Sequence, residues 1–149
     1  MPTFSLVADY CQFYLFDEGA SPRYPEDITD ADVLRQFKAV PNLVAVYTDA
    51  ATEFAITVEC DERPRELNPS SWAHIVEGPL NVPSGRVVLA SPSSELAHAP
   101  AIAVKPGAYR VRVAVPHNSE AGRRCYLVCL WPSALATVEV IKPSVQRAA

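Results

Sequence analysis

The sequence predicts a mainly β fold, an antiparallel β-sandwich of about eight strands with one short helix near residues 30–39. Three observations predict this fold class. Strand-like runs follow one another along the chain, each run is closed by proline, glycine or serine, and one segment alone carries a helix start signal. The 14 prolines are spread over the 149 residues, so they separate elements and do not form a linker. The length suits a single domain covering residues 1–149.

The clearest strand starts near Tyr109 and alternates with a period of two residues. Tyr109, Val111 and Val113 share one face, and Arg110 and Arg112 share the other. This alternation is typical of a strand with one buried face and one solvated face. We therefore expect the three apolar side chains to be buried and both arginines to be exposed.

The first element is expected to be one long strand over residues 4–16. Both of its faces are largely apolar, which predicts a central strand or a strand between two layers. Residues 17–27 combine turn-forming and acidic residues and are expected to form an exposed loop.

A short helix is expected next, over residues 30–39. Thr29 and Asp32 have the spacing of a capping box, and Pro41 would end the helix. Its buried stripe is expected to comprise Val33, Leu34 and Phe37.

The remaining elements are expected to be strands separated by turns and polar loops. They are predicted at residues 43–47, 54–60, 72–82, 86–90, 102–104, 109–115, 125–131 and 137–141.

Charge is distributed unevenly along the chain. Residues 1–75 carry 13 acidic and 5 basic side chains, a net charge of −8, and residues 76–149 carry 4 acidic and 8 basic, a net of +4. These acids are either solvated loop residues or a face that steers a basic partner. The acidic excess is densest at six residues, of which the first four are candidate binding residues: Asp17, Glu18, Glu26, Asp27, Asp30 and Asp32. The acidic total argues against nucleic-acid binding.

The first residues contain neither a basic segment nor a long apolar segment, and no stretch approaches the length of a membrane span. We therefore expect a cytoplasmic protein with reduced thiols and no membrane association. The four cysteines include no Cys-x-x-Cys, and the three histidines form no metal-binding motif. No metal and no cofactor is expected.

No catalytic motif is present: there is no Gly-x-Ser-x-Gly elbow and no glycine-rich phosphate loop. The sequence therefore favours a protein without enzymatic activity, although an active site assembled from distant residues stays open. His74 would share a strand face with Trp72, as a half-buried histidine or as part of a binding surface. Together with Tyr109 these residues could line a pocket between the sheets.

Two segments resemble competence protein J, the family of DNA-entry nuclease inhibitors. They are Tyr10-x-Gln12-Phe13-x-x-Phe16, followed by the acidic loop and capped helix, and the strand entry over residues 104–111. Residues 72–86 and 126–132 also resemble a broad group of uncharacterised small bacterial β-proteins. The resemblance implies a compact β fold and binding of a protein partner.

Three functions follow as alternatives. The first is a non-enzymatic protein-binding domain, either a nuclease inhibitor or an immunity-type protein, with a basic partner such as a nuclease or toxin. The second is a small-ligand sensor or enzyme with a pocket between the sheets. The third is a structural subunit of an oligomer, and the sequence leaves the oligomeric state open.

Overall fold

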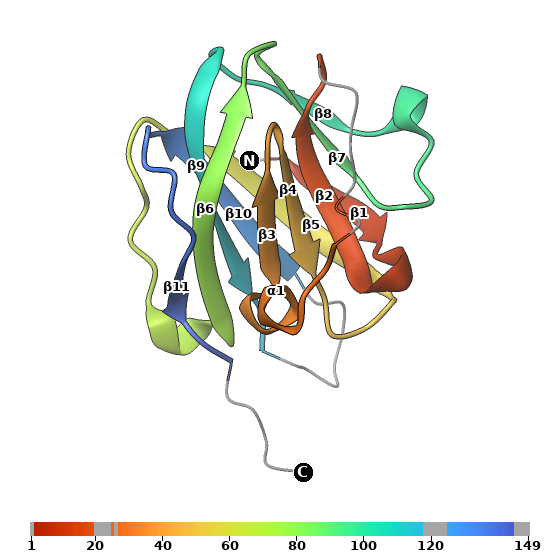
Figure 1. Cartoon of the computed structure of the whole chain (residues 1–149), viewed down its shortest axis with the longest axis vertical. Helices are drawn as coiled ribbons and strands as arrows, with labels where there is room; N and C mark the ends of the chain where they lie inside the picture. The colour runs from red at the N-terminus through yellow and green to blue at the C-terminus, as the bar shows by residue number, and fades with distance from the viewer. Residues whose placement is uncertain (1, 20–24, 26, 118–124, 145–149) are drawn as a thin grey trace.

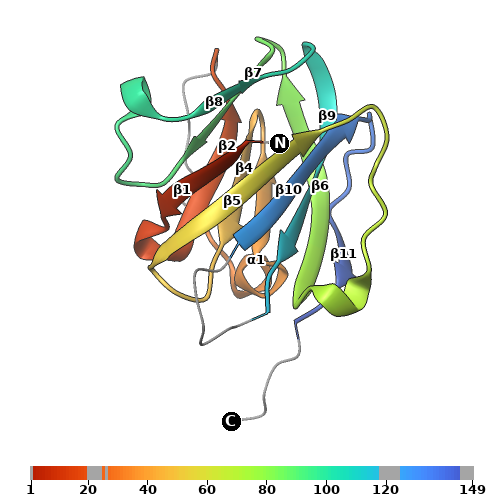
Figure 2. The same ribbon diagram turned by 180° about the vertical axis from the view of Figure 1, so that it is seen from behind.

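The computed structural model describes residues 2–19, 25, 27–117 and 125–144. In this part of the chain, eleven strands form two sheets that pack face to face (Figure 1). Sheet A has the strand order β1-β5-β10-β9-β6-β11, and sheet B has the order β3-β4-β2-β7-β8. Figure 2 shows sheet A from its outer side. The mainly β, two-sheet fold class is confirmed; β5 and β10 form the parallel pair among otherwise antiparallel pairs.

The strands have the following bounds: β1 Thr3–Val7, β2 Gln12–Asp17, β3 Phe37–Val40, β4 Leu43–Tyr47, β5 Glu53–Cys60, β6 His74–Val82, β7 Arg86–Ala90, β8 Ala101–Ala103, β9 Gly107–Val115, β10 Cys125–Pro132 and β11 Glu139–Lys142. The helices are α1, Asp30–Arg35, and three 3-10 turns, η1 Asp9–Cys11, η2 Pro69–Ser71 and η3 Leu96–His98.

The core lies between the sheets and is built by alternate residues of each strand. On β10, Tyr126 and Val128 point into it, and their neighbours Leu127 and Cys129 lie in a second buried cluster on the outer face of sheet A. A third cluster, which includes Tyr14 and Phe16, covers the outer face of sheet B. β2 is therefore buried on both faces and central, as predicted, but β1 from the same predicted segment is a largely exposed edge strand of sheet A, so the prediction is wrong for that part.

The expected single strand over residues 4–16 is broken in the structure. β1 belongs to sheet A and β2 to sheet B, and η1 carries the chain from one sheet to the other. Tyr10 and Cys11 adopt left-handed conformations with φ of 56° and 57°. The sequence does not indicate this break, because a segment that is apolar on both faces has the same pattern whether its residues belong to one sheet or to two.

The apolar face of β9 is as expected, with Tyr109, Val111 and Val113 buried. The exposure predicted for the arginines is wrong. Arg110 is 2% exposed, and the side chain of Arg112 is 16% exposed. Both donate to the buried carboxylate of Glu77 on β6, at 2.9 Å and 2.7 Å. The chain after β10 covers Arg110, because its Nη1 donates to the carbonyl oxygens of residues 135 and 137.

Gly78 on β6 lies directly against the ring of Phe37 on β3. A Cβ added at Gly78 would come under 3.0 Å from two ring carbons of Phe37. We expect Gly78→Ala to lower the free energy of unfolding by about 1–3 kcal/mol, because the ring must leave its packed position. Chemical denaturation would measure the change. Asn81→Ala on the same strand, where the side chain is exposed, serves as the control. An unchanged unfolding midpoint for Gly78→Ala would contradict the prediction.

Candidate protein-binding surface

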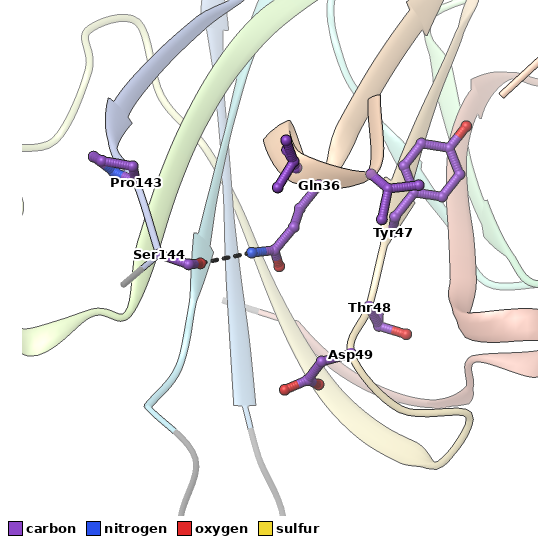
Figure 3. Close-up of a pocket in the computed structure, with 8 residues that line it drawn as sticks. Gln36, Tyr47, Thr48, Asp49, Pro143 and Ser144 are labelled. Atoms are coloured by element: carbon purple, nitrogen blue, oxygen red, sulfur yellow. Dashed lines mark hydrogen bonds between the residues drawn. The ribbon is translucent and has the colours of Figure 1, made fainter. Parts of the chain in front are cut away.

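A groove of about 590 Å³ lies at one end of the sandwich, beside α1. Three segments far apart in the sequence form it: α1, the end of β4 with the residues after it, and the residues that follow β11 (Figure 3). The side chains that line it are Val33, Leu34, Gln36, Tyr47, Thr48, Asp49, Pro143 and Ser144.

The helix beside the groove turns its apolar side chains outward. The capping box is confirmed, because Thr29 Oγ1 accepts from the Asp32 N–H and the Asp32 carboxylate accepts from the Thr29 N–H. The helix ends earlier than expected, at Arg35, because Gln36 adopts a left-handed conformation with φ of 58°. Val33 and Leu34 are 52% and 57% exposed, so the prediction that they form a buried stripe is wrong.

Phe37, the third member of the expected stripe, is buried, but as the first residue of β3. The signal for this strand is in the sequence. Residues 37–40, apolar except for Lys38, and the apolar run 43–47 are joined by Pro41-Asn42, and Asn42 has the positive φ of 63° that a tight turn requires. The capping box marked where the helix begins, but no comparable signal marks where it ends.

His74 ties the two walls of the groove together. Its Nε2–H donates to the carbonyl oxygen of Arg35 at 2.7 Å, and its Nδ1 accepts from the N–H of Ser144 at 3.0 Å. Burial lowers the pKa of His74, and the hydrogen bond to Arg35 opposes this effect. The imidazole is therefore neutral with its proton on Nε2. Next to it, the Gln36 amide donates to Ser144 Oγ at 2.8 Å (Figure 3).

Acidic side chains lie around this end of the molecule. Asp49 is exposed and lines the groove, and Asp27 and Asp30 are exposed before and at the start of α1. Asp32 is instead turned inward, with Lys38 Nζ at 3.0 Å. Burial opposes ionisation of Asp32, but hydrogen bonds from Thr29 and Lys38 outweigh it and hold its pKa below the usual value.

The acids predicted as one binding segment do not come together. Asp17 is 1% exposed and accepts from Ser84 N and Oγ at 3.0 Å and 2.5 Å, so the expectation that it is free for a partner is wrong. Glu18 is exposed and pairs with Arg86 at 2.6 Å. Asp17 ends β2 next to the β6–β7 turn, whereas Asp27 lies near α1, at the opposite end of the sandwich (Figure 1). Glu26 lies outside the described residues.

Trp72, His74 and Tyr109 do not line a common pocket. His74 pairs with Val115 and Tyr109 pairs with Leu80, so they lie six positions apart along β6, about 20 Å. Tyr109 is buried in the core and its hydroxyl donates to the carbonyl oxygen of residue 105 at 2.5 Å. Trp72 packs half-buried against the cluster on the outer face of sheet A.

Within the described residues, no three His, Cys, Asp or Glu side chains are arranged to hold a metal ion. The helices of this part of the chain are also too short or too polar to cross a bilayer.

Known proteins resemble this chain in structure. No protein-family model and no curated protein matches its sequence. Among solved structures, ComJ from Bacillus subtilis, the inhibitor of the DNA-degrading activity of NucA, superposes with a TM-score of 0.76. The two are 17% identical over 89% of this chain and 96% of ComJ. The product of crocagin biosynthetic gene J is 18% identical over 87% and 95%, with a TM-score of 0.63. The chain has a ComJ-like fold.

Proposed function

We propose that this chain is a protein-binding inhibitor of a nuclease. The observation that carries the proposal is the ComJ-like fold, which extends over 89% of the chain and nearly all of ComJ. ComJ inhibits the DNA-degrading activity of NucA. The open groove beside α1 supports the proposal, because exposed apolar side chains gathered on one surface are typical of protein interaction sites. An inhibitor of this kind acts by covering the nuclease, and it needs no catalytic group of its own.

The proposal predicts that the purified chain slows DNA degradation. The chain is titrated into two plasmid-degradation assays, one with NucA and one with the DNA-degrading extract of the cell that makes the chain. We expect at least one activity to fall by half at about 1 μM chain, a concentration typical of specific protein complexes. A DNase of unrelated fold is the control and should be unaffected. The proposal fails if neither activity falls, or if the unrelated DNase is slowed equally, since the chain would then be shielding the DNA.

A further inference from the structure

The segment after β11 is attached to the rest of the molecule at few points. Lys142, the last residue of β11, is anchored, because its Nζ donates to two backbone carbonyl oxygens in and after η2 at 2.7 Å and 2.6 Å. Pro143 is exposed and has no N–H to donate. In the described part of the chain, the hydrogen bonds that hold the segment beyond Lys142 are both made by Ser144. Its N–H donates to His74 Nδ1 at 3.0 Å, and its Oγ accepts from the Gln36 side-chain amide at 2.8 Å (Figure 3).

His74 accepts the hydrogen bond from Ser144 only while its ring is neutral. Its Nε2–H donates to the carbonyl oxygen of Arg35 at 2.7 Å, so Nδ1 carries the lone pair that receives the Ser144 N–H. In a protonated ring both nitrogens are donors. Two N–H groups then face each other at Nδ1, and the attraction to Ser144 becomes a repulsion. The link to Arg35 remains, because Nε2 keeps its proton.

In the described part of the chain, no carboxylate is bonded to His74 to compensate a positive charge on its ring. The titratable groups on the segments packed around the ring are Asp32, Arg35, Lys38, Tyr47, Asp49, His117 and Lys142. The three on α1 and β3 pair with one another, since Arg35 and Lys38 lie 3.6 Å and 3.0 Å from the Asp32 carboxylate. Burial raises the pKa of Tyr47 to about 12, so its hydroxyl stays neutral. Asp49 lies on the opposite wall of the groove (Figure 3).

Proton binding therefore favours the state in which Ser144 has left the ring. With Ser144 in place, His74 is buried, and burial lowers its pKa below the ordinary value of 6.5. With Ser144 displaced, the Nδ1 edge of the ring opens to solvent, and the pKa returns toward the ordinary value. The displaced state binds the proton more tightly, so its population rises as the pH falls below about 6.5, by up to about tenfold per pH unit. The rise stops below the pKa of the closed state.

We propose that His74 and Ser144 form a pH-sensitive switch that sets the shape of the groove beside α1. Neutral His74 holds the Pro143–Ser144 segment in place as one wall of the groove. Protonation releases this segment as far back as Lys142, and the groove loses that wall. The change is local, because Lys142 keeps its anchor and β11 stays paired with β6. The switch belongs to the chain itself and requires no nuclease.

Amide hydrogen exchange of Ser144 tests the switch. The exchange is followed by NMR between pH 8 and pH 5 and corrected for the intrinsic rate at each pH. We expect the protection of this amide to fall by up to about tenfold for each pH unit below 6.5. Long-range nitrogen spectra should show the proton of His74 on Nε2 at pH 8 and a doubly protonated ring at pH 5. Val113 on β9 reports unfolding of the core, and its amide should stay far better protected than that of Ser144 at every pH.

Two variants fix the switch in either position. His74→Gln keeps a donor toward the end of α1 and an acceptor toward Ser144 but has no proton to gain, so the protection of Ser144 should no longer depend on pH. Ser144→Pro has neither the N–H nor the hydroxyl. Its Gln36 side-chain amide should already show at pH 8 the signals that the unmodified chain shows at pH 5. His117→Gln is the matched control, because His117 is exposed and bonds to a backbone carbonyl oxygen of η2. It should leave the pH dependence of Ser144 unchanged.

Ser144→Ala separates the two links, since it removes the hydroxyl and keeps the N–H. Its amide should exchange faster at pH 8 than in the unmodified chain and keep the same pH dependence. Both Ser144 variants change a half-buried residue outside every strand, so they test the switch without replacing the buried His74.

Three results would overturn the proposal. The first is a protection of Ser144 that does not change between pH 8 and pH 5, and the second is the same pH dependence in His74→Gln. The third is equal protection of Ser144 and Val113, which would mean that Ser144 is exposed only when the core unfolds.

Discussion

Glu77→Ala is expected to lower the free energy of unfolding by about 3–5 kcal/mol, the largest single effect we predict for a polar residue. Glu77 is 6% exposed and accepts from Arg110 Nε at 2.9 Å and from Arg112 Nε and Nη2 at 2.7 Å. Its removal leaves the guanidinium of Arg110, itself 2% exposed, without its buried counter-charge. A buried charge that loses its partner keeps the desolvation cost and loses the attraction that offset it.

Urea denaturation of the variant would measure this loss. Glu139→Ala is the matched control, because Glu139 also lies near Arg110, at 3.7 Å, but its side chain is 57% exposed. Solvent screens that pair, so the control should cost less than about 1 kcal/mol. The double variant Glu77→Leu/Arg110→Met should recover much of the stability, since it removes both charges together. Equal losses from Glu77→Ala and Glu139→Ala would show that Arg110 does not depend on its buried partner.

Acidification below pH 6.5 is expected to destabilise the protein through His74, and His74→Gln is expected to remove most of that dependence. Burial lowers the pKa of His74 below its usual value of 6.5, whereas the unfolded chain keeps the usual value. The unfolded state therefore binds the proton first as the pH falls. The contribution of neutral His74 to the free energy of unfolding is fully present above about pH 6.5. It decreases as the pH falls below this value, by up to about 1.4 kcal/mol per pH unit, and the decrease stops below the folded-state pKa of His74.

The geometry gives a second reason for this sensitivity. Protonated Nδ1 can no longer accept from the N–H of Ser144, so the walls of the groove lose one of their links. Arg35 and Lys142 are the basic residues on the chain segments that meet at His74, and neither favours a further positive charge there. The lowered pKa of Asp32 contributes in a separate window, below its usual value of 3.8.

Thermal unfolding between pH 8 and pH 5 would test the His74 prediction. His98→Gln is the control, because the side chain of His98 is 80% exposed and lies away from the groove, so its replacement should change the stability little. Amide exchange at Gln36 and Ser144 should speed up at pH 5 in the unmodified protein, where the link through His74 is lost. The same pH profile in His74→Gln and the unmodified chain would assign the acid sensitivity to another group.

Local patterns in the sequence determined the features that depend on neighbouring residues. The period-two alternation after Gly107 identified Tyr109, Val111 and Val113 as buried, because a strand places alternate side chains on one face wherever the strand lies. The Thr29–Asp32 pair located the start of α1, since a capping box is closed within four residues. The resemblance to competence protein J likewise rested on short segments, and the fold confirms it.

The tertiary structure alone decided which surfaces are open. Arg110 is buried because β6 supplies Glu77 and the chain after β10 covers it, two partners 33 and 25 or more residues away. Val33 and Leu34 are exposed because the helix ends before Phe37. Phe37 instead begins β3, where it pairs with Val46 of β4 in a hairpin. Asp17 and Asp27 are ten residues apart in the sequence but lie at opposite ends of the sandwich, because β2 ends at Asp17 beside the β6–β7 turn whereas Lys38 binds Asp27 near α1. Long-range strand pairing fixes these positions, and no local pattern encodes it.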